Sequence, residues 1–176
     1  MLVGFSKLVV VMAALTGPTA GAPLDAQLRD SNNVPVALAH FRGKPTIVFY
    51  EDRNSTKVNV QVKKELFARG KSLNLLSSTH IIAVADLRGF DFFPARNFAL
   101  KAIRDVEAKA HIPVLVDWNR TLCQAPWGLP PERASVVILD DQGRRIYARS
   151  GSLTDADVRT FFTALAGVLH VTLPKG

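Results

Sequence analysis

The sequence predicts an α/β protein in which helices cover both faces of a central mixed β-sheet, as a three-layer α/β/α sandwich. Short apolar runs that suit buried strands alternate with longer amphipathic segments that suit helices. After them come two strands separated by a glycine-containing turn, and then a last helix. Alternating strands and helices favour parallel pairing, and a hairpin adds antiparallel pairing, so we expect a mixed sheet with a C-terminal β-hairpin plus helix.

The chain length and composition predict one domain, at residues 23–172. A chain of 176 residues that is 48% hydrophobic is long enough for one substantial core and short for two. Residues 1–22 predict a signal peptide, because Lys7 precedes a short apolar run at 8–15 and small residues follow it. The predicted location is therefore periplasmic or secreted. Pro23 directly after the Ala-x-Ala is unfavourable for cleavage, so an uncleaved membrane anchor and a buried N-terminal helix are the alternatives.

The charge is basic but dispersed. The formal net charge is +7, yet lysines and arginines form no compact run. This pattern favours solvated faces with a general attraction to anionic surfaces, and it indicates no specific nucleic-acid partner. Membrane contact is expected only through an uncleaved leader.

The strands are expected in the following order. Residues 34–41 suggest an edge strand, because Pro35 cannot donate a ladder hydrogen bond. Residues 46–50 form the central β-branched and aromatic run. Two further buried strands, each stopped by an aspartate, and the two hairpin strands are expected at 81–85, 112–116, 134–139 and 144–149.

Two long helices are expected between these strands. The first covers residues 56–69, is capped by Ser55 or Thr56, and turns inward the residues Val58, Val62, Leu66 and Phe67. The second covers residues 95–110 and turns inward Phe98, Ala102, Val106 and either Ile103 or Ala110. The aromatic residues before it, at 90, 92 and 93, are expected to fill the core rather than to form a binding surface.

A short helical segment at 121–127 and the last helix complete the prediction. Thr154 begins the last helix, and Asp155 and Asp157 in its first turn suit the helix dipole. Its inward face is expected to consist of Val158, Phe161, Phe162, Leu165 and Leu169.

Three segments carry a family resemblance: Phe-Arg-Gly-Lys-Pro at 41–45, Ile-Pro-Val-Leu-Val-Asp at 112–117, and the hairpin sequence at 136–144. From residue 38 to residue 169 the chain resembles the thioredoxin-like superfamily, in its exported branch related to thiol-disulfide reductases and peroxiredoxins. The nearest resemblance is to the YtfJ-type periplasmic proteins, a small family without a settled function. It rests on residues 125–129, 134–140 and 151–154.

The chain departs from the superfamily where the redox chemistry is expected. The resemblance implies a Cys-x-x-Cys motif at a helix N-terminus, where the thiol pKa is lowered. Its two cysteine positions are occupied here by Asn54 and Lys57. A cis-proline that faces this motif is implied at position 134, which is occupied by Ala134. A peroxiredoxin cysteine would belong to the same loop and is also missing.

The favoured hypothesis is a non-catalytic binding or interaction module without a cofactor. Its partner would be an unidentified protein or a small anionic ligand, because Arg53, Asn54 and Lys57 are expected at a helix N-terminus, which suits an anion. The candidate ligand-binding rim consists of Glu51, Asp52, Arg53, Asn54, Lys57 and Arg133.

Two enzymatic alternatives stay open. A thiol-dependent antioxidant or oxidoreductase would use Cys123, the single cysteine, which excludes an internal disulfide and is expected away from the 54–57 loop as a small buried hydrophobe. A non-thiol activity would use the aspartates that end the strands, Asp52, Asp86 and Asp117, which are expected to converge. Aspartates at such positions commonly cap loops, so no metal is expected there. The expected oligomeric state is a monomer or a weak dimer.

Overall fold

The computed structural model describes residues 21–72 and 75–171. Its elements are β1 (Gln27–Arg29), β2 (Pro35–Ala37), the 3-10 turn η1 (Leu38–Phe41), β3 (Thr46–Asp52), α1 (Val60–Ser72), α2 (Leu75–Ser78), β4 (His80–Asp86), α3 (Ala95–Ala110), β5 (Val114–Asp117), the 3-10 turn η2 (Thr121–Cys123), β6 (Ser135–Leu139), β7 (Arg145–Ser150) and α4 (Asp155–Leu169). Residues 1–20, most of the predicted leader, lie outside the described residues.

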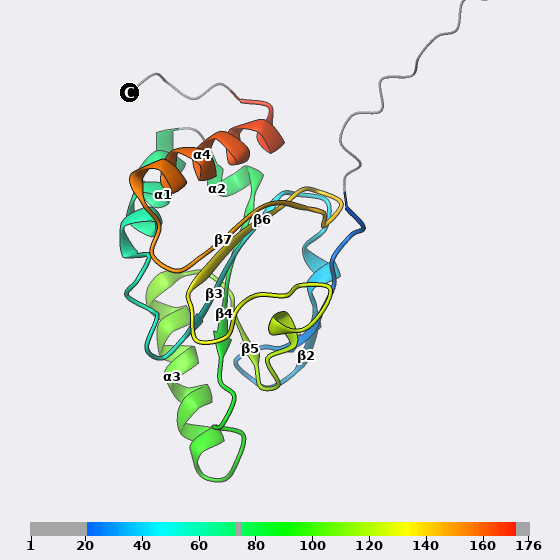
Figure 1. The fold of residues 1–176 in the computed structure, drawn as a ribbon. Coiled ribbons are helices and arrows are strands. Elements are labelled where there is room, and N and C mark those ends of the chain that lie inside the picture. The colour runs from blue at the N-terminus through cyan, green and yellow to red at the C-terminus, as the bar shows by residue number, and fades with distance from the viewer. Residues whose placement is uncertain (1–20, 73–74, 172–176) are drawn as a thin grey trace, which may run out of the picture.

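Within the described part of the chain, seven strands form one sheet in the order β2-β1-β5-β4-β3-β6-β7 (Figure 1). The neighbours β3, β4 and β5 are parallel, whereas β6 pairs antiparallel with β3, and β7 with β6. At the other edge, β1 pairs antiparallel with β5 and β2 with β1. The predicted α/β class, with a mixed sheet and a C-terminal hairpin plus helix, is confirmed.

The two faces of the sheet are covered differently from the prediction, which placed helices on both. In Figure 1, α1, α3 and α4 lie on one side of the sheet, and the N-terminal segment with the η2 loop lies on the other. The physical reason is the strand order, since the connections β3-α1-β4 and β4-α3-β5 step in the same direction across the sheet. Crossovers of one hand that step in one direction place their helices on one face.

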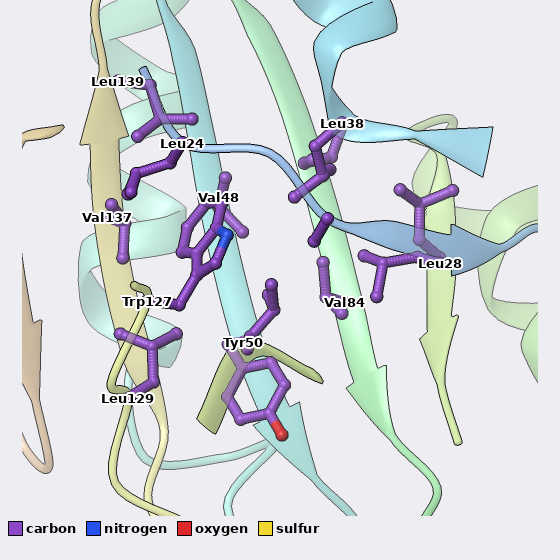
Figure 2. Packing of buried hydrophobic residues seen from close by; sticks show 14 residues of the cluster. Leu24, Leu28, Leu38, Val48, Tyr50, Val84, Trp127, Leu129, Val137 and Leu139 are labelled. Atoms are coloured by element: carbon purple, nitrogen blue, oxygen red, sulfur yellow. The ribbon is translucent and has the colours of Figure 1, made fainter. Parts of the chain in front are cut away.

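Hydrophobic side chains fill both faces. On the helix side, Phe161, Phe162 and Leu165 of α4 pack with Val62 and Leu66 of α1 against the sheet. The opposite face is closed by loop residues, and Figure 2 shows the indole of Trp127 lying over β3 beside Val48. The Trp127 Nε1–H donates to the backbone oxygen of Asp25 at 2.9 Å, which ties the η2 loop to the N-terminal segment.

The first long helix begins later than predicted. Residues 53–59 form turns and α1 starts at Val60, so neither Ser55 nor Thr56 is its cap. The hydroxyl of Ser55 instead accepts a hydrogen bond from the Asp52 N–H at 3.0 Å. The prediction that Val62 and Leu66 face inward is confirmed, whereas Val58 precedes the helix and is 42% exposed.

The second long helix has its predicted bounds, and Ile103 is buried as one of the predicted alternatives, but Phe98, Ala102 and Val106 do not face inward. Leu100 and Ile103 are the buried residues of α3, whereas Phe98 and Val106 are 69% and 49% exposed, and Ala102 is exposed too. The helix rests on β5 through Leu100 and Ile103, which pack with Val114, Val116 and Trp118. Phe98 lies two residues before Leu100 and therefore points to the far side of the helix.

The other predicted elements are present, some of them shorter than predicted, whereas β1 and α2 were not predicted. Thr154 and Asp157 form a capping box at the start of α4, and Phe161, Phe162 and Leu165 are buried as predicted. The predicted helical segment at 121–127 is only the 3-10 turn η2. No helix among the described residues is both long and apolar enough to cross a bilayer.

Candidate functional site

The three parallel strands β3, β4 and β5 end in aspartates that lie side by side. The register pairs Asp52 with Asp86, and Asp86 with Asp117. The predicted convergence of these residues at the carboxyl end of the sheet is therefore confirmed, at the end where α/β proteins commonly bind ligands. Three adjacent carboxylates need compensating partners, because like charges in close proximity repel one another.

Two of the three carboxylates hold their own loops. Asp117 is 1% exposed and accepts three backbone N–H hydrogen bonds, at 2.8–3.2 Å, from residues 119–122. Asp52 accepts the N–H groups of Asn54 and Ser55 at 3.2 and 2.8 Å. These bonds tie the carboxylates to their own loops, and the described residues contain no group of three or more His, Cys, Asp or Glu side chains arranged for a metal.

The third carboxylate is neutralised by an arginine. Asp86 is buried, and the Arg120 Nε lies 2.8 Å from its Oδ2. A second guanidinium nitrogen of Arg120 lies 3.5 Å from a carboxylate oxygen of Glu132. Arg120 and Glu132 both have left-handed backbones, with φ of 55° and 61°. This conformation costs a non-glycine residue about 1–2 kcal/mol and is concentrated at ligand sites and switch regions.

A cleft with a volume of about 690 Å³ opens at this end of the sheet. It is lined by Asp52, Arg53, Asn54, Asp86, Arg88, Phe90, Arg120 and Glu132. Arg53 and Arg88 are exposed, and neither guanidinium group has a hydrogen-bond or ion-pair partner within the described part of the chain. The arrangement offers two unpaired guanidinium groups beside a carboxylate that already has its own cation.

The sequence-derived rim is only partly brought together. Asp52, Arg53 and Asn54 line the cleft, as described above. The Glu51 carboxylate instead contacts the Lys63 ammonium, at 2.6 and 2.7 Å for its two oxygens. Lys57 and Arg133 are exposed but are not among the residues that line the cleft.

Solved structures that are similar to the chain cover most of its length. The secreted thiol-disulfide isomerase of Corynebacterium glutamicum has a TM-score of 0.61 at 11% identity, covering 84% of this chain and 85% of that chain. The thiol peroxidase of Chromobacterium violaceum has a TM-score of 0.59 at 12% identity, covering 86% and 87%. The exposed lipoprotein thioredoxin of Streptococcus pneumoniae has a TM-score of 0.55 at 13% identity, covering 82% of this chain and 99% of that chain.

The chain has a thioredoxin-like fold. At these sequence identities the likeness establishes the fold and not the activity. No model of a protein family and no curated protein sequence matches the chain.

In this thioredoxin-like fold, the positions predicted to correspond to Cys-x-x-Cys lie in the turns before α1. Asn54 and Lys57 are both exposed, and α1 begins only at Val60. The prediction that Arg53, Asn54 and Lys57 stand at the helix N-terminus is therefore wrong. The reason is local, since Asp52 and Ser55 bond to each other and close a separate turn ahead of the helix.

The predicted cis-proline position lies directly before β6. Ala134 is buried, and its backbone oxygen accepts a hydrogen bond from the Gly151 N–H at 2.7 Å. Among the described residues, cis peptide bonds occur at Phe93–Pro94 and Ala125–Pro126, and not before Ala134.

The single thiol lies closer to the end of β3 than expected. The sulfur of Cys123 is 3.2 Å from the hydroxyl oxygen of Tyr50, two residues before Asp52, because η2 packs back onto the sheet. Cys123 is partly buried and does not line the cleft. Burial raises the pKa of its thiol, and the hydrogen bond from Tyr50 and the charge of Arg120 only partly offset this.

Three charged residues of the cleft, Arg88, Arg120 and Glu132, were missed by sequence reasoning. Arg88 follows Asp86 by two residues, so the strand-ending aspartate is a signal that could have found it. Arg120 and Glu132 carry no such signal, because their backbone conformation and mutual contact depend on how the 118–134 loop folds over the sheet.

Proposed function

We propose that this thioredoxin-like chain is a binding module that holds an anionic group of a partner protein or small ligand in the cleft. The observation that carries the proposal is the pair of exposed arginines, Arg53 and Arg88, whose guanidinium groups have no partner within the described residues. Guanidinium groups suit carboxylate and phosphate oxygens, because their planar N–H donors bind two oxygens at once.

The acidic side chains of the cleft support this proposal rather than oppose it. Asp86 is paired with Arg120, and the Asp52 Oδ1 accepts the N–H groups of Asn54 and Ser55, which keeps that oxygen turned toward its own turn. Arg53 and Arg88 are thus the charges still available to an incoming anion, while Glu132 stands exposed at the edge beside Arg120.

The backbones that carry the two arginines are held in place. Arg53 lies within the turn that Asp52 closes through Ser55, and the Arg88 N–H donates to the Asp86 Oδ1 at 3.1 Å. Fixing the backbone lowers the ordering cost of binding, although the long side chains still lose freedom.

The surroundings of Cys123 favour a binding role over the thiol-dependent alternative. A nucleophilic thiol needs a lowered pKa and access to solvent. Cys123 has a raised pKa and is partly buried, and no second cysteine exists to resolve an oxidised intermediate. The structural neighbours are the remaining argument for the thiol-dependent hypothesis, because one of them is named a thiol peroxidase.

We also propose that the protein is periplasmic or secreted and that it is related to the YtfJ-type proteins. The names of two structural neighbours, a secreted isomerase and an exposed lipoprotein, support export. The YtfJ-type relationship rests on the sequence segments alone. We propose a monomer or weak dimer with no specific nucleic-acid partner, because the cations are dispersed along the chain.

The test is a titration of the isotope-labelled protein with glutarate and, separately, with inorganic phosphate, followed by backbone amide NMR. We expect shifts in the 52–54 and 86–90 segments, with a dissociation constant on the order of 1 mM for either small probe. The double variant Arg53→Gln/Arg88→Gln should abolish these shifts. The matched control Lys64→Gln removes an exposed cation of α1 outside the cleft and should leave them unchanged. Shifts that persist in the double variant, or equal loss in the control, would overturn the proposal.

A further inference from the structure

We infer that the ligand is an acidic peptide segment of a partner protein, in which a bulky apolar side chain lies next to a carboxylate. The inference rests on the proposed function, because it assigns the carboxylate to Arg53 and Arg88. It adds a second contact, an apolar groove between α3 and the 87–90 segment.

The groove encloses about 440 Å³ and is almost entirely apolar apart from Arg53. Its walls include Leu87, Phe90, Phe98, Ala99, Ala102 and Ile103. The small side chains of Ala99 and Ala102 leave the hollow, and Phe98 forms one side of it. A concave apolar surface of this kind suits the insertion of a bulky side chain.

Exposed aromatic residues also occur just before α3 and in its first turn. Phe92 and Phe93 are 60% and 84% exposed, and Phe98 is 69% exposed. The sequence-based prediction that the aromatic residues before α3 fill the core is wrong for Phe92 and Phe93, although Phe90 does pack against the core. Grouped exposed aromatic side chains commonly mark a surface that another molecule covers.

The groove and the cleft adjoin each other, because Arg53 and Phe90 line both. A ligand that fills the groove therefore ends beside the unpaired arginines. Charge complementarity then selects the partner: an apolar side chain in the groove, followed by a carboxylate at Arg53 and Arg88.

The charges around the groove favour a peptide over a second copy of the chain. In a symmetric dimer through this face, Arg53 and Arg88 of both copies would meet without an acidic partner. A peptide carboxylate instead meets unpaired cations.

The test uses three fluorescein-labelled hexapeptides and measures fluorescence anisotropy. The first peptide is Gly-Ser-Phe-Glu-Ser-Gly; the second replaces its Phe by Gly, and the third replaces its Glu by Gln. We expect the first peptide to bind about tenfold more tightly than either of the others, since partial burial of one aromatic side chain is worth about 1.4 kcal/mol.

Variants of the full chain separate the two contacts. Ala102→Gln fills the groove and should reduce binding of the first peptide about tenfold while leaving the second unchanged. Ala108→Gln, at an exposed α3 position outside the groove, is its matched control and should have no effect. Arg53→Gln should weaken both acidic peptides.

The outcomes distinguish the two proposals. If the first two peptides bind with equal affinity and Ala102→Gln does not change the affinity of the first, the groove does not bind the apolar side chain. The proposed anion site would be unaffected by that result. Failure of every acidic peptide and of glutarate would overturn both. Two further results would overturn the peptide. If the protein binds phosphatidylglycerol vesicles more tightly than peptide and Phe98→Ser abolishes this binding, the groove contacts a membrane. If sedimentation velocity shows a dimer that Phe98→Ser abolishes, the groove contacts a second copy of the chain.

Discussion

The hydroxyl oxygen of Tyr50 lies 3.2 Å from the sulfur of Cys123, on the face of the sheet that carries Trp127. The contact joins the end of β3 to η2 and places the thiol against a buried ring. Burial, followed by the hydrogen bond to Cys123, raises the pKa of Tyr50 far above its usual range. A tyrosine that stays protonated and a thiol with a raised pKa form a structural contact rather than a nucleophilic one.

We expect native Cys123 to react with Ellman's reagent at pH 8 at least about tenfold more slowly than in denaturant, because burial disfavours the thiolate. Tyr50→Phe should raise the thiol pKa further, since the hydroxyl hydrogen bond lowers it. Tyr147→Phe, which removes a hydroxyl bonded to the Asp157 backbone oxygen, is the control. A native reaction rate equal to the denatured one would revive the thiol-dependent alternative.

The second prediction concerns Glu51, which was predicted as a rim residue but forms an ion pair with Lys63 in the structure. Burial raises the pKa of Glu51 despite the opposing effect of Lys63. The folded state therefore binds this proton more tightly than the unfolded chain, whose glutamate pKa is about 4.3. The Glu51 contribution to the free energy of unfolding accordingly increases as the pH falls through the folded pKa, and levels off below the unfolded value.

Urea unfolding of wild type and Glu51→Gln between pH 4 and pH 8 checks this. The wild type should gain stability relative to the variant as the pH falls, because glutamine cannot take up the proton. Glu65→Gln, which removes a carboxylate from the more exposed pair with Arg69, is the control for the loss of an ion pair of α1. Parallel curves for wild type and Glu51→Gln would contradict the prediction.

The fold was predictable because its signals are local. β-branched apolar runs mark the buried strands, and Thr154 with Asp157 marks the start of α4. The alignment of Asp52, Asp86 and Asp117 was predictable too, since parallel strands that end in aspartate bring their carboxyl ends to one edge.

The missed features depend on contacts between distant parts of the chain. α1 begins at Val60 after the buried Asn59, whose side chain bonds to the Gly151 oxygen and the Leu153 N–H across the fold. On α3 the sequence offers apolar positions on two sides of the helix, and only the docking of Leu100 and Ile103 on β5 decides between them. The exposed Phe98 and Ala102 then line the groove beside α3.

Asp117 provides the third prediction, because it separates a loop-capping role from a ligand-binding one. Its Oδ1 accepts the N–H groups of Asn119 and Thr121, and its Oδ2 accepts that of Leu122 at 3.0 Å. Asp117→Ala leaves these donors unpaired beside a buried site and should lower the free energy of unfolding by about 2–4 kcal/mol. Asp117→Asn keeps the Oδ1 acceptor and should cost about half as much.

Urea unfolding measures both losses, and the amide NMR titration with glutarate measures whether the cleft survives. Asp117 does not line the cleft, so Asp117→Asn should bind glutarate with unchanged affinity. Asp105→Ala, an exposed aspartate of α3, should change stability by less than about 0.5 kcal/mol. A stable Asp117→Asn variant that no longer binds glutarate would move Asp117 from the loop into the binding site, because the lost oxygen would then act on the ligand rather than on the Leu122 N–H.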